Sequence, residues 1–290
     1  MATKSTLILF LLLGFGGFPL AQSISARKEN EFQRELRFKS NTAPLVVVRN
    51  VAGNVRVEGH DGNTVILEAR ETLSAKSDRK LEDATNEVRL VTKVVDDVIL
   101  IYPQTPDTEA HLKGRTLDYK IDRRNDSYRF RYDLFIRVPR QVSLDASTVN
   151  DGEVYAKDVN GDKILLSNVN GAVRAEDIPG LEKASNINGP ISISYASQPN
   201  RDASFNTVNG KIEVRLPQDL QANVHFKSTN GDLYTDYENV SIGPRYTKSN
   251  RKRGQHTTYK LDQATVMKIN GGGPTLDFDV LNGNVYVKKY

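Results

Sequence analysis

Glycine recurs at near-constant intervals across the second half of this 290-residue chain. Five glycines stand nine or ten residues apart, and two more follow at steps of 21. All but Gly180 come directly after Asn or Asp, and such dipeptides supply the positive φ values of tight turns. The structural turns predicted in this way are Gly152, Gly161, Gly171, Gly189, Gly210, Gly231 and, near the end of the chain, Gly283.

Apolar and polar residues alternate after most of these glycines. A period of two, rich in Val and Ile, predicts strands with one buried face. After Gly210, for example, we expect Ile212 and Val214 to point inward, and Glu213 and Arg215 to point outward.

Two architectures use such turns: a meander of hairpins and a solenoid whose turns are corners. A third apolar position, seven residues after a glycine, holds Val159, Ile178 and Ile187. A straight strand cannot place positions four and seven on one face, whereas a corner between them can. The pattern favours an all-β fold, a parallel β-solenoid with Asn-Gly corner turns and rungs of 18–21 residues.

Stacked rungs have a consequence for the asparagines. Strands of neighbouring rungs would lie about 4.8 Å apart. Asn188, Asn209 and Asn230 would then form one column, able to join their side-chain amides in a ladder. Calcium-binding solenoids also repeat every nine residues, but Asp158 and Asp177 here lack a second acidic partner, so we expect no calcium.

The chain before the glycine series is less regular. Strands alternate over residues 35–72, and one short flanking helix is expected near residues 76–90. There Leu81, Ala84 and Val88 form a single apolar stripe, which suits a helix that caps or flanks the solenoid.

The N-terminus has the features of a secretory signal. Lys4 supplies a positive charge, and the apolar run Leu7–Phe15 is too short to span a bilayer. Cleavage after Ala21 would remove a signal peptide over residues 1–21; an uncleaved anchor is the alternative. No later segment is apolar enough for a transmembrane span, so we expect an exported protein that is periplasmic, on the cell surface or secreted.

The mature chain divides into three parts. Polar residues 22–34 are expected to form a flexible lead, and residues 35–290 one β-solenoid domain. Within that domain, residues 35–140 form the less regular part, including a long polar connection over residues 103–127. Residues 141–290 form the glycine-repeat part.

Composition excludes several kinds of function. The chain has no cysteine, which excludes disulfides, thiolate metal sites, a cysteine nucleophile and a lipoprotein anchor. Its net charge of +4 falls to +3 without Lys4, a balance too mild for a nucleic-acid-binding protein.

No catalytic motif stands out. The histidines, His60, His111, His225 and His256, lack metal-ligand spacing, and there is no phosphate-binding loop or nucleophile elbow, so we expect no metal and no cofactor. Outward residues of stacked strands could still assemble an acid–base pair, which keeps a carbohydrate-active enzyme open. Those outward residues are Glu213, Arg215, Asp232, Tyr234 and Asp236, and the tyrosines that could stack on sugars are Tyr234, Tyr237 and Tyr286.

A basic segment interrupts the repeat. Forty residues separate Gly231 from Gly271, and residues 247–256 in this gap resemble a strand-poor loop. Insertions in solenoids often lie on a binding face, so the loop is a candidate site for anionic partners such as acidic glycans or lipid head groups. A solubilising loop without a partner is the alternative. The candidate residues are Arg245, Lys248, Arg251, Lys252 and Arg253.

Two stretches carry a resemblance to a known family. FIRVPRQVSLDASTVNDGEVYAKDVNG and the later INGGGPTLDFDVLNGNVYVKK resemble the bacterial "putative adhesin" family over roughly residues 35–290. The resemblance implies an exported all-β repeat domain of unknown function with no catalytic residues. Glu182 departs from the pattern, because the repeat has an apolar residue there.

Together these features predict a non-catalytic binding, adhesion or scaffold module at the bacterial cell envelope. Glycans or envelope proteins are the expected partners, and nucleic acid is not. The alternatives are a carbohydrate-active β-helix enzyme and an envelope signalling partner that acts by protein contact.

Overall fold

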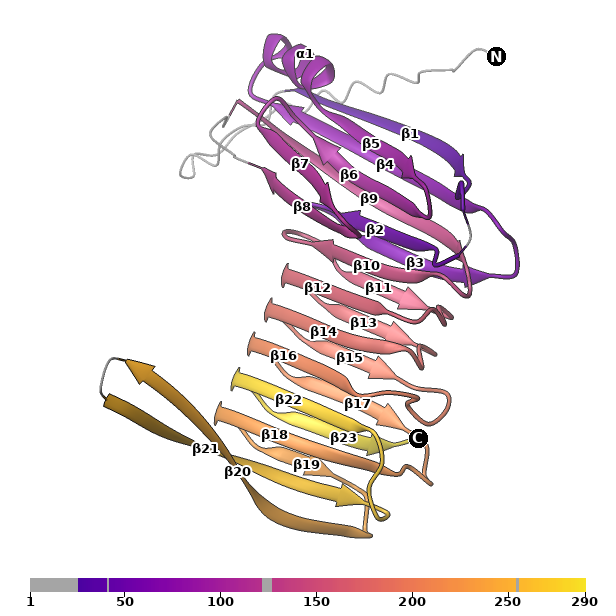
Figure 1. The fold of residues 1–290 in the computed structure, drawn as a ribbon. Helices are drawn as coiled ribbons and strands as arrows, with labels where there is room; N and C mark the ends of the chain where they lie inside the picture. The colour runs from indigo at the N-terminus through magenta and orange to yellow at the C-terminus, as the bar shows by residue number, and fades with distance from the viewer. Residues whose placement is uncertain (1–25, 41, 122–126, 254–255) are drawn as a thin grey trace, which may run out of the picture.

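In a computed structural model of the protein, two large β-sheets face each other along the length of the molecule (Figure 1). The structure describes residues 26–40, 42–121, 127–253 and 256–290, and only the backbone of residues 244–253 and 256–265. The predicted signal peptide, residues 1–21, lies outside the described residues. An all-β fold with parallel strands is confirmed.

The first sheet, called sheet A here, has ten strands. Their spatial order is β1 (Ala26–Leu36), β4 (Val65–Ala75), β9 (Tyr128–Pro139), β3 (Val55–His60), β11 (Val154–Lys157), β13 (Val173–Glu176), β15 (Ile191–Ser194), β17 (Ile212–Leu216), β23 (Val285–Lys289) and β19 (Leu233–Thr235). Residues 26–34 therefore do not form the flexible lead that their polarity predicted. They belong to β1, whose whole length pairs antiparallel with β4.

The second sheet, sheet B, has eleven strands. Their order is β20 (Val240–Arg253), β21 (His256–Ile269), β18 (Ala222–Asn230), β22 (Thr275–Asn282), β16 (Ala203–Asn209), β14 (Leu181–Asn188), β12 (Ile164–Asn170), β10 (Ser143–Thr148), β2 (Leu45–Arg49), β6 (Val98–Gln104) and β5 (Arg89–Val95). A small hairpin, β7 (Thr108–Lys113) and β8 (Thr116–Ile121), lies within the predicted polar connection. It packs on Leu45, Val47 and Leu100 in a second apolar cluster.

The helix predicted near residues 76–90 is present as α1 (Asp78–Glu87). Ser77 caps it by accepting a hydrogen bond from the Lys80 backbone N–H. Its apolar stripe packs on β4, β9 and β1 through the buried Ala84, so the helix covers one end of the core (Figure 1).

Each rung of the stack contributes one strand to sheet B and the next strand to sheet A. Parallel partners bring like residues together, as in Val154, Val173, Ile191 and Ile212 of successive rungs. All four side chains are buried, and they form part of one continuous core. Because each rung repeats its apolar positions in register, the interior is a single column of aliphatic and aromatic side chains.

Glycines stack at the corner between the two sheets. A β-carbon on Gly171 would collide with the backbone carbonyl of Gly152, and one on Gly210 with that of Gly189. Gly171 and Gly210 also have φ values of +150° and +155°, which L-residues rarely adopt. Gly161 and Gly180 stack on each other at the opposite corner, so the nine-residue step alternates between the two corners of one rung.

That alternation corrects one assignment of the core. Val159 and Ile178 are buried as predicted, but Ile187 is 44% exposed. It lies at the Asn-Gly corner, between the register pairs Asn186–Thr207 and Asn188–Asn209. Seven residues after Gly152 or Gly171, the chain is near the corner of Gly161 and Gly180. Seven residues after Gly180, it is at the opposite, Asn-Gly corner.

An amide ladder runs along the Asn-Gly corner. Asn188 donates to Asn170, Asn209 donates to Asn188, and Asn282 donates to Asn209, each with N···O of 2.8–2.9 Å. Asn230 in turn donates to Asn282. The predicted column of Asn188, Asn209 and Asn230 exists, but Asn282 separates its last two members.

This insertion reflects an exchange of order in the stack. The rung β22–β23 lies between β16–β17 and β18–β19, although it follows both of them in the chain. The other edge of β18 pairs antiparallel with β21, so β18 has a partner on each side. Both edges of β18 are thereby covered.

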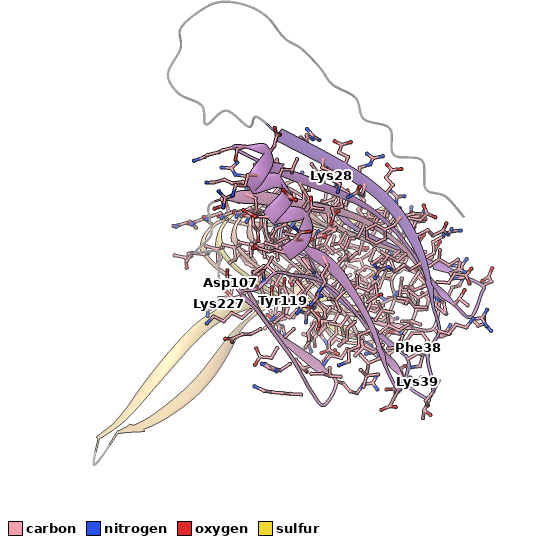
Figure 2. The ribbon with its side chains drawn as sticks, turned by 90° about the horizontal axis from the view of Figure 1, so that it is seen from above. Lys28, Phe38, Lys39, Asp107, Tyr119 and Lys227 are labelled. Carbon is pink, nitrogen blue, oxygen red and sulfur yellow. The ribbon has the colours of Figure 1, made fainter. Side chains whose placement is uncertain are left out.

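The segment predicted as a strand-poor basic loop is a long hairpin. β20 and β21 pair antiparallel from Val240–Ile269 to Arg253–His256. The hairpin projects away from the stack, in Figure 2 on the side of the labelled Lys227. The prediction was wrong because it weighed the basic strand alone; the partner strand HTTYKLDQATVMKI is rich in the β-branched and aromatic residues that favour strands.

Candidate binding surface

The five candidate basic residues lie together on β20, within the projecting hairpin. Backbone pairing places Arg245 opposite Ala264, Lys248 opposite Leu261 and Arg253 opposite His256. Arg251 and Lys252 pair with the intervening residues of β21. Their side chains lie outside the described part of the chain, so the structure gives the strand that carries them but no contact that they make.

A pair of tyrosines stands on the outward face of sheet A. Tyr234 of β19 and Tyr286 of β23 are register partners, and their rings stack at 5.1 Å with an interplanar angle of 13°. β19 is the last strand of sheet A, so no strand of the sheet covers the other ring face of Tyr234. That side chain is 47% exposed. The stack therefore presents one open aromatic face to solvent.

Three cations surround a carboxylate beside the tyrosines. Glu213 of β17 lies 2.9 Å from Arg215, 3.5 Å from Lys211 and 3.8 Å from Lys288, oxygen to nitrogen. The Lys288 ammonium also lies over the Tyr286 ring, 5.2 Å from its centroid. We call Tyr234, Tyr286, Glu213, Lys211, Arg215 and Lys288 the tyrosine–cation patch.

The patch carries an excess of positive charge. Partial burial alone would raise the pKa of Glu213, but the hydrogen bond from Arg215 and the neighbouring cations lower the pKa overall. Glu213 therefore stays ionised at neutral pH and balances one of three cations. Each cation is about half exposed, whereas the Glu213 side chain is only 14% exposed. A ligand would thus meet the cations before it meets the carboxylate.

Other predicted surface residues have structural partners. Tyr237 is buried, with its hydroxyl donating to the Pro217 carbonyl at 2.6 Å, so it does not belong to the exposed stack. Asp232 lies 3.5 Å from the Tyr234 hydroxyl, and Asp236 accepts a hydrogen bond from the Lys289 backbone N–H. The outward carboxylates are therefore spread over ion pairs and backbone contacts and do not converge.

A second polar group lies on the outward face of sheet B. Asp277 and Asp279 of β22 are register partners of His225 and Lys227 of β18, and Lys227 lies 3.9 Å from Asp279. Both aspartates are exposed. Among the described residues, no group of three or more His, Asp and Glu is placed to hold a metal ion.

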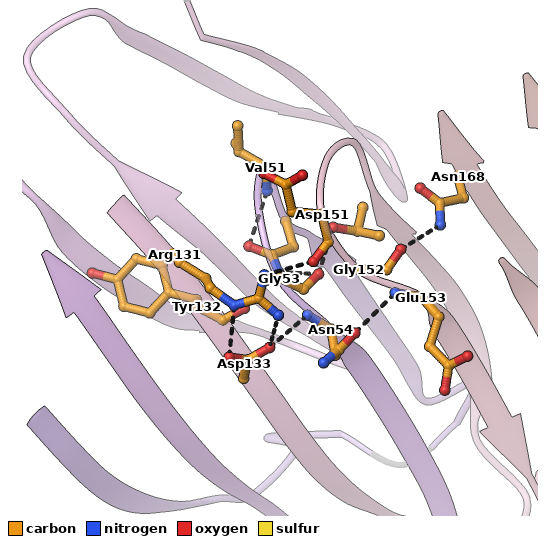
Figure 3. Close-up of polar contacts among 12 residues, drawn as sticks. Val51, Gly53, Asn54, Arg131, Tyr132, Asp133, Asp151, Gly152, Glu153 and Asn168 are labelled. Atoms are coloured by element: carbon orange, nitrogen blue, oxygen red, sulfur yellow. Dashed lines mark hydrogen bonds and ion pairs between the residues drawn. The ribbon is translucent and has the colours of Figure 1, made fainter. Parts of the chain in front are cut away.

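Hydrogen bonds fix the corner where the N-terminal part meets the repeats (Figure 3). Arg131 holds Asp133 through two contacts of 2.7 and 2.8 Å, and reaches the Asp151 carbonyl at 2.6 Å. Asp133 also accepts from the Asn54 backbone N–H at 2.9 Å. Desolvation alone would raise the pKa of Asp133, but these hydrogen bonds lower it below its ordinary value. The polar groups of this cluster hydrogen-bond to one another, so we interpret it as a structural joint between the two parts of the fold.

Sequence reasoning found only part of the patch. It named Tyr234, Tyr286, Glu213 and Arg215, yet it missed Lys211 and Lys288. The signal that finds them is the register between β17 and β23, which places Arg215 beside Lys288 and Glu213 beside Tyr286. This register could not be predicted from the sequence, because the sequence does not show that β23 pairs with β17.

The fold and the exposed patch define a class of protein: an all-β, solenoid-like repeat protein with polar outward faces. The chain belongs to the Toastrack DUF4097 family, whose model matches residues 46–265. This confirms the resemblance to the bacterial "putative adhesin" family, which is of unknown function. No curated protein matches the chain. In the described part of the chain, no helix has the length and apolar character needed to cross a membrane.

The solved structures to which this chain is similar share little of its sequence, and the TM-scores are below 0.5. One is a "putative cell adhesion protein" from Clostridium sporogenes, with 13% identity and a TM-score of 0.44 over 91% of this chain and 100% of that one. A "putative adhesin" from Bacteroides fragilis has 10% identity and a TM-score of 0.35, over 90% and 97% of the two chains. A "putative lipid binding protein" from Parabacteroides distasonis has 14% identity and a TM-score of 0.29 over the same shares.

Proposed function

We propose that this protein is an exported, non-catalytic binding module at the bacterial cell envelope, and that its ligand is an anionic glycan. The observation that carries the proposal is the tyrosine–cation patch. It joins an open aromatic face with three half-exposed cations that share the Glu213 carboxylate as their ion-pair partner.

Both parts of the patch suit the same chemistry. An aromatic ring has a negative face, which attracts the partly positive C–H groups on the flat side of a sugar ring. Arg215 and Lys288 lie on the neighbouring strands β17 and β23, and Lys211 directly precedes β17, so all three are within reach of a carboxylate or sulfate on the same polymer. Charge-assisted hydrogen bonds to such groups are stronger than neutral ones. A neutral glycan would use only the ring, and a bare anion only the cations.

The enzyme alternative has less support. Glycoside hydrolysis needs two carboxyl groups facing one bond. The carboxylates named as a possible acid–base pair, Glu213, Asp232 and Asp236, are divided among Arg215, the Tyr234 hydroxyl and the Lys289 backbone. A signalling partner bound by protein contact remains the second alternative, and the β20–β21 hairpin is the element that would reach it.

Export rests on the sequence. Lys4, the run Leu7–Phe15 and Ala21 predict a mature chain that begins near Gln22. Mass spectrometry of the N-terminus of the exported protein tests this directly, and recovery of the intact Met1 would contradict cleavage.

Glycan binding is tested with polygalacturonate as the anionic probe and dextran as the neutral one. We expect polygalacturonate alone to bind, with an affinity that falls as salt rises. Tyr234→Ala, and separately Lys211→Gln with Lys288→Gln, should each weaken binding by about tenfold, equal to about 1.4 kcal/mol. Tyr290→Ala is the matched control, because Tyr290 is exposed but outside the stack.

A third variant distinguishes the patch from the hairpin. It replaces Arg245, Lys248, Arg251, Lys252 and Arg253 by Gln. If polygalacturonate binding is lost here and kept in the patch variants, the site belongs to the hairpin. If neither polymer binds the wild-type chain at low salt, the glycan proposal is wrong.

A further inference from the structure

The rung β22–β23 is held as an insert between two rungs that precede it in the chain. On one side, the N–H groups of Gly210 and Ile212 donate to the carbonyls of Asn282 and Asn284, both at 3.0 Å. On the other side, the N–H groups of Gly283 and Val285 donate to the carbonyls of Asn230, at the end of β18, and Asp232, in the corner before β19, both at 2.9 Å. The insert therefore fills a slot that has a complete backbone edge on each side.

The two neighbours of the slot could also stack on each other. The three rungs carry the same residue types at the same register: the inward rings Phe205, Phe278 and Phe226, the ladder amides Asn209, Asn282 and Asn230, and the corner glycines Gly210, Gly283 and Gly231. Phe205 and Phe278 stack at 4.8 Å. Phe226 and Gly231 could therefore make the contacts with β16–β17 that Phe278 and Gly283 make now. If the insert leaves, β18–β19 can pair directly with β16–β17.

A glycine-rich hinge precedes the insert. The segment Asn270-Gly-Gly-Gly-Pro274 joins β21 to β22, and Asn270, Gly271 and Gly272 have φ values of +48°, +89° and +93°. No atom beyond its chain neighbours lies within 4 Å of the β-carbon position of Gly271. The space beside Gly271 is therefore open, but contacts hold the rest of the hinge: Asn270 donates to the Leu220 carbonyl, and the Gly273 and Pro274 carbonyls accept from Asn223. Release of the insert breaks these contacts, and the glycines then let the backbone take another path.

The rung outside the slot is the less buried one. β19 has only three residues, and its Leu233 and Thr235 are half-buried whereas Val285 and Val287 of β23 are fully buried. Segments with few buried apolar contacts open at lower free energy than the rest of a fold. In sheet A, we therefore expect β23 to separate from β19 before it separates from β17, with which it has the longer register.

We propose that β22–β23 is an exchangeable rung, and that its partner is the same slot in a second copy of this chain. Backbone hydrogen bonds to both edges supply the affinity, as in other cases of strand addition. The Asn-Gly corner sets the register, because only a glycine fits against the carbonyl of Gly210. If each copy places its β22–β23 in the slot of the other, the two copies form a domain-swapped dimer without any new side-chain contact. This inference does not depend on the tyrosine–cation patch being a glycan site.

The experiment uses the full-length chain and a fluorescent peptide of residues 274–290. The two are incubated at increasing urea concentrations below the onset of global unfolding, returned to buffer and separated by size. We expect the peptide to elute with the protein. A Gly283→Val peptide should be retained more than about tenfold less, because its β-carbon meets the Gly210 carbonyl at a strained φ.

Two outcomes would overturn the proposal. One is the absence of peptide retention at every urea concentration short of unfolding. The other is equal retention of both peptides, which would show nonspecific binding.

A hinge variant tests the second copy as partner. Deleting Gly271 and Gly272 from the full chain should favour exchange between copies, since short hinges hinder return to the same chain. Light scattering should then report a dimer that unfolds at the urea concentration of the wild-type protein. A monomer of unchanged stability would contradict the proposal, and if the variant does not fold, peptide retention by the wild-type chain decides.

Discussion

The carbonyl oxygen of Gly210 occupies the space that a β-carbon on Gly283 would need, although the two residues are 73 positions apart. Each glycine of the Asn-Gly corner meets the backbone of the neighbouring rung in this way. The obstacle is main chain, so it cannot move aside as the end of a flexible side chain would.

Gly210→Ala should therefore be costly. The new β-carbon would meet the Gly189 carbonyl at a φ of +155°, and we expect a loss of about 3 kcal/mol from strain and overpacking together. Urea denaturation measures it. Gly243→Ala is the control, since the space around Gly243 is open, and it should change stability by less than about 0.5 kcal/mol. Similar losses at the two positions would contradict the stacked corner.

The same substitution at two isoleucines should have different costs. Ile212 is fully buried in the core, and Ile212→Ala should destabilise the protein by about 2–5 kcal/mol. Ile187 is 44% exposed, and Ile187→Ala should cost less than about 1 kcal/mol. Thermal and urea unfolding of both variants provide the comparison. Equal costs would mean that Ile187 points into the core, as its spacing from Gly180 suggested.

Acid should weaken the joint at Asp133. The pKa of Asp133 is lower in the folded protein than in the unfolded chain. Ionised Asp133 therefore contributes its full share of the folding free energy above the unfolded pKa, about 3.9. That share is lost as pH falls through the lower pKa of the folded protein. The stability difference between the wild-type protein and Asp133→Asn should thus shrink as pH falls below about 4. Arg131→Gln should flatten the wild-type dependence in the same range. A difference that is constant with pH would show that Asp133 does not titrate differently on folding.

The amide ladder should depend on position. Asn209→Ala removes the hydrogen bond donated to Asn188 and the one accepted from Asn282. Asn230→Ala removes only the bond donated to Asn282. We expect losses of about 1 and 0.5 kcal/mol, at the low end because the amides are exposed. Chemical denaturation should separate the two variants; a larger loss for Asn230→Ala would contradict a ladder that ends there.

The glycine and apolar spacing predicted much of the repeat because each rung is locally complete. Corner, strand and inward side chains all recur within about twenty residues, as in the units around Gly171 and Gly189. The position of β22–β23 could not be predicted in this way. Phe205, Phe226 and Phe278 are interchangeable by type, so their order in space depends on where β21 pairs.

The same limit applies to the candidate site. Tyr234 and Tyr286 lie 52 residues apart, and the sequence marks each as outward without placing them side by side. Their contact exists only because β23 is next to β19. The prediction of a loop over the basic segment was wrong for a related reason. Arg251 and Lys252 lie in a strand because β21 pairs with them, and their charges do not reveal that partner.

The inserted rung also constrains how the chain can be assembled during synthesis. β18 and β19 leave the ribosome about forty residues before β22, yet the place beside β16–β17 belongs to the later segment. Growth of the solenoid in the order of translation would close that place too early. The last rungs must wait undocked, or dock and separate again, so completion of this protein is a step that follows translation of residues 275–289 and does not accompany it.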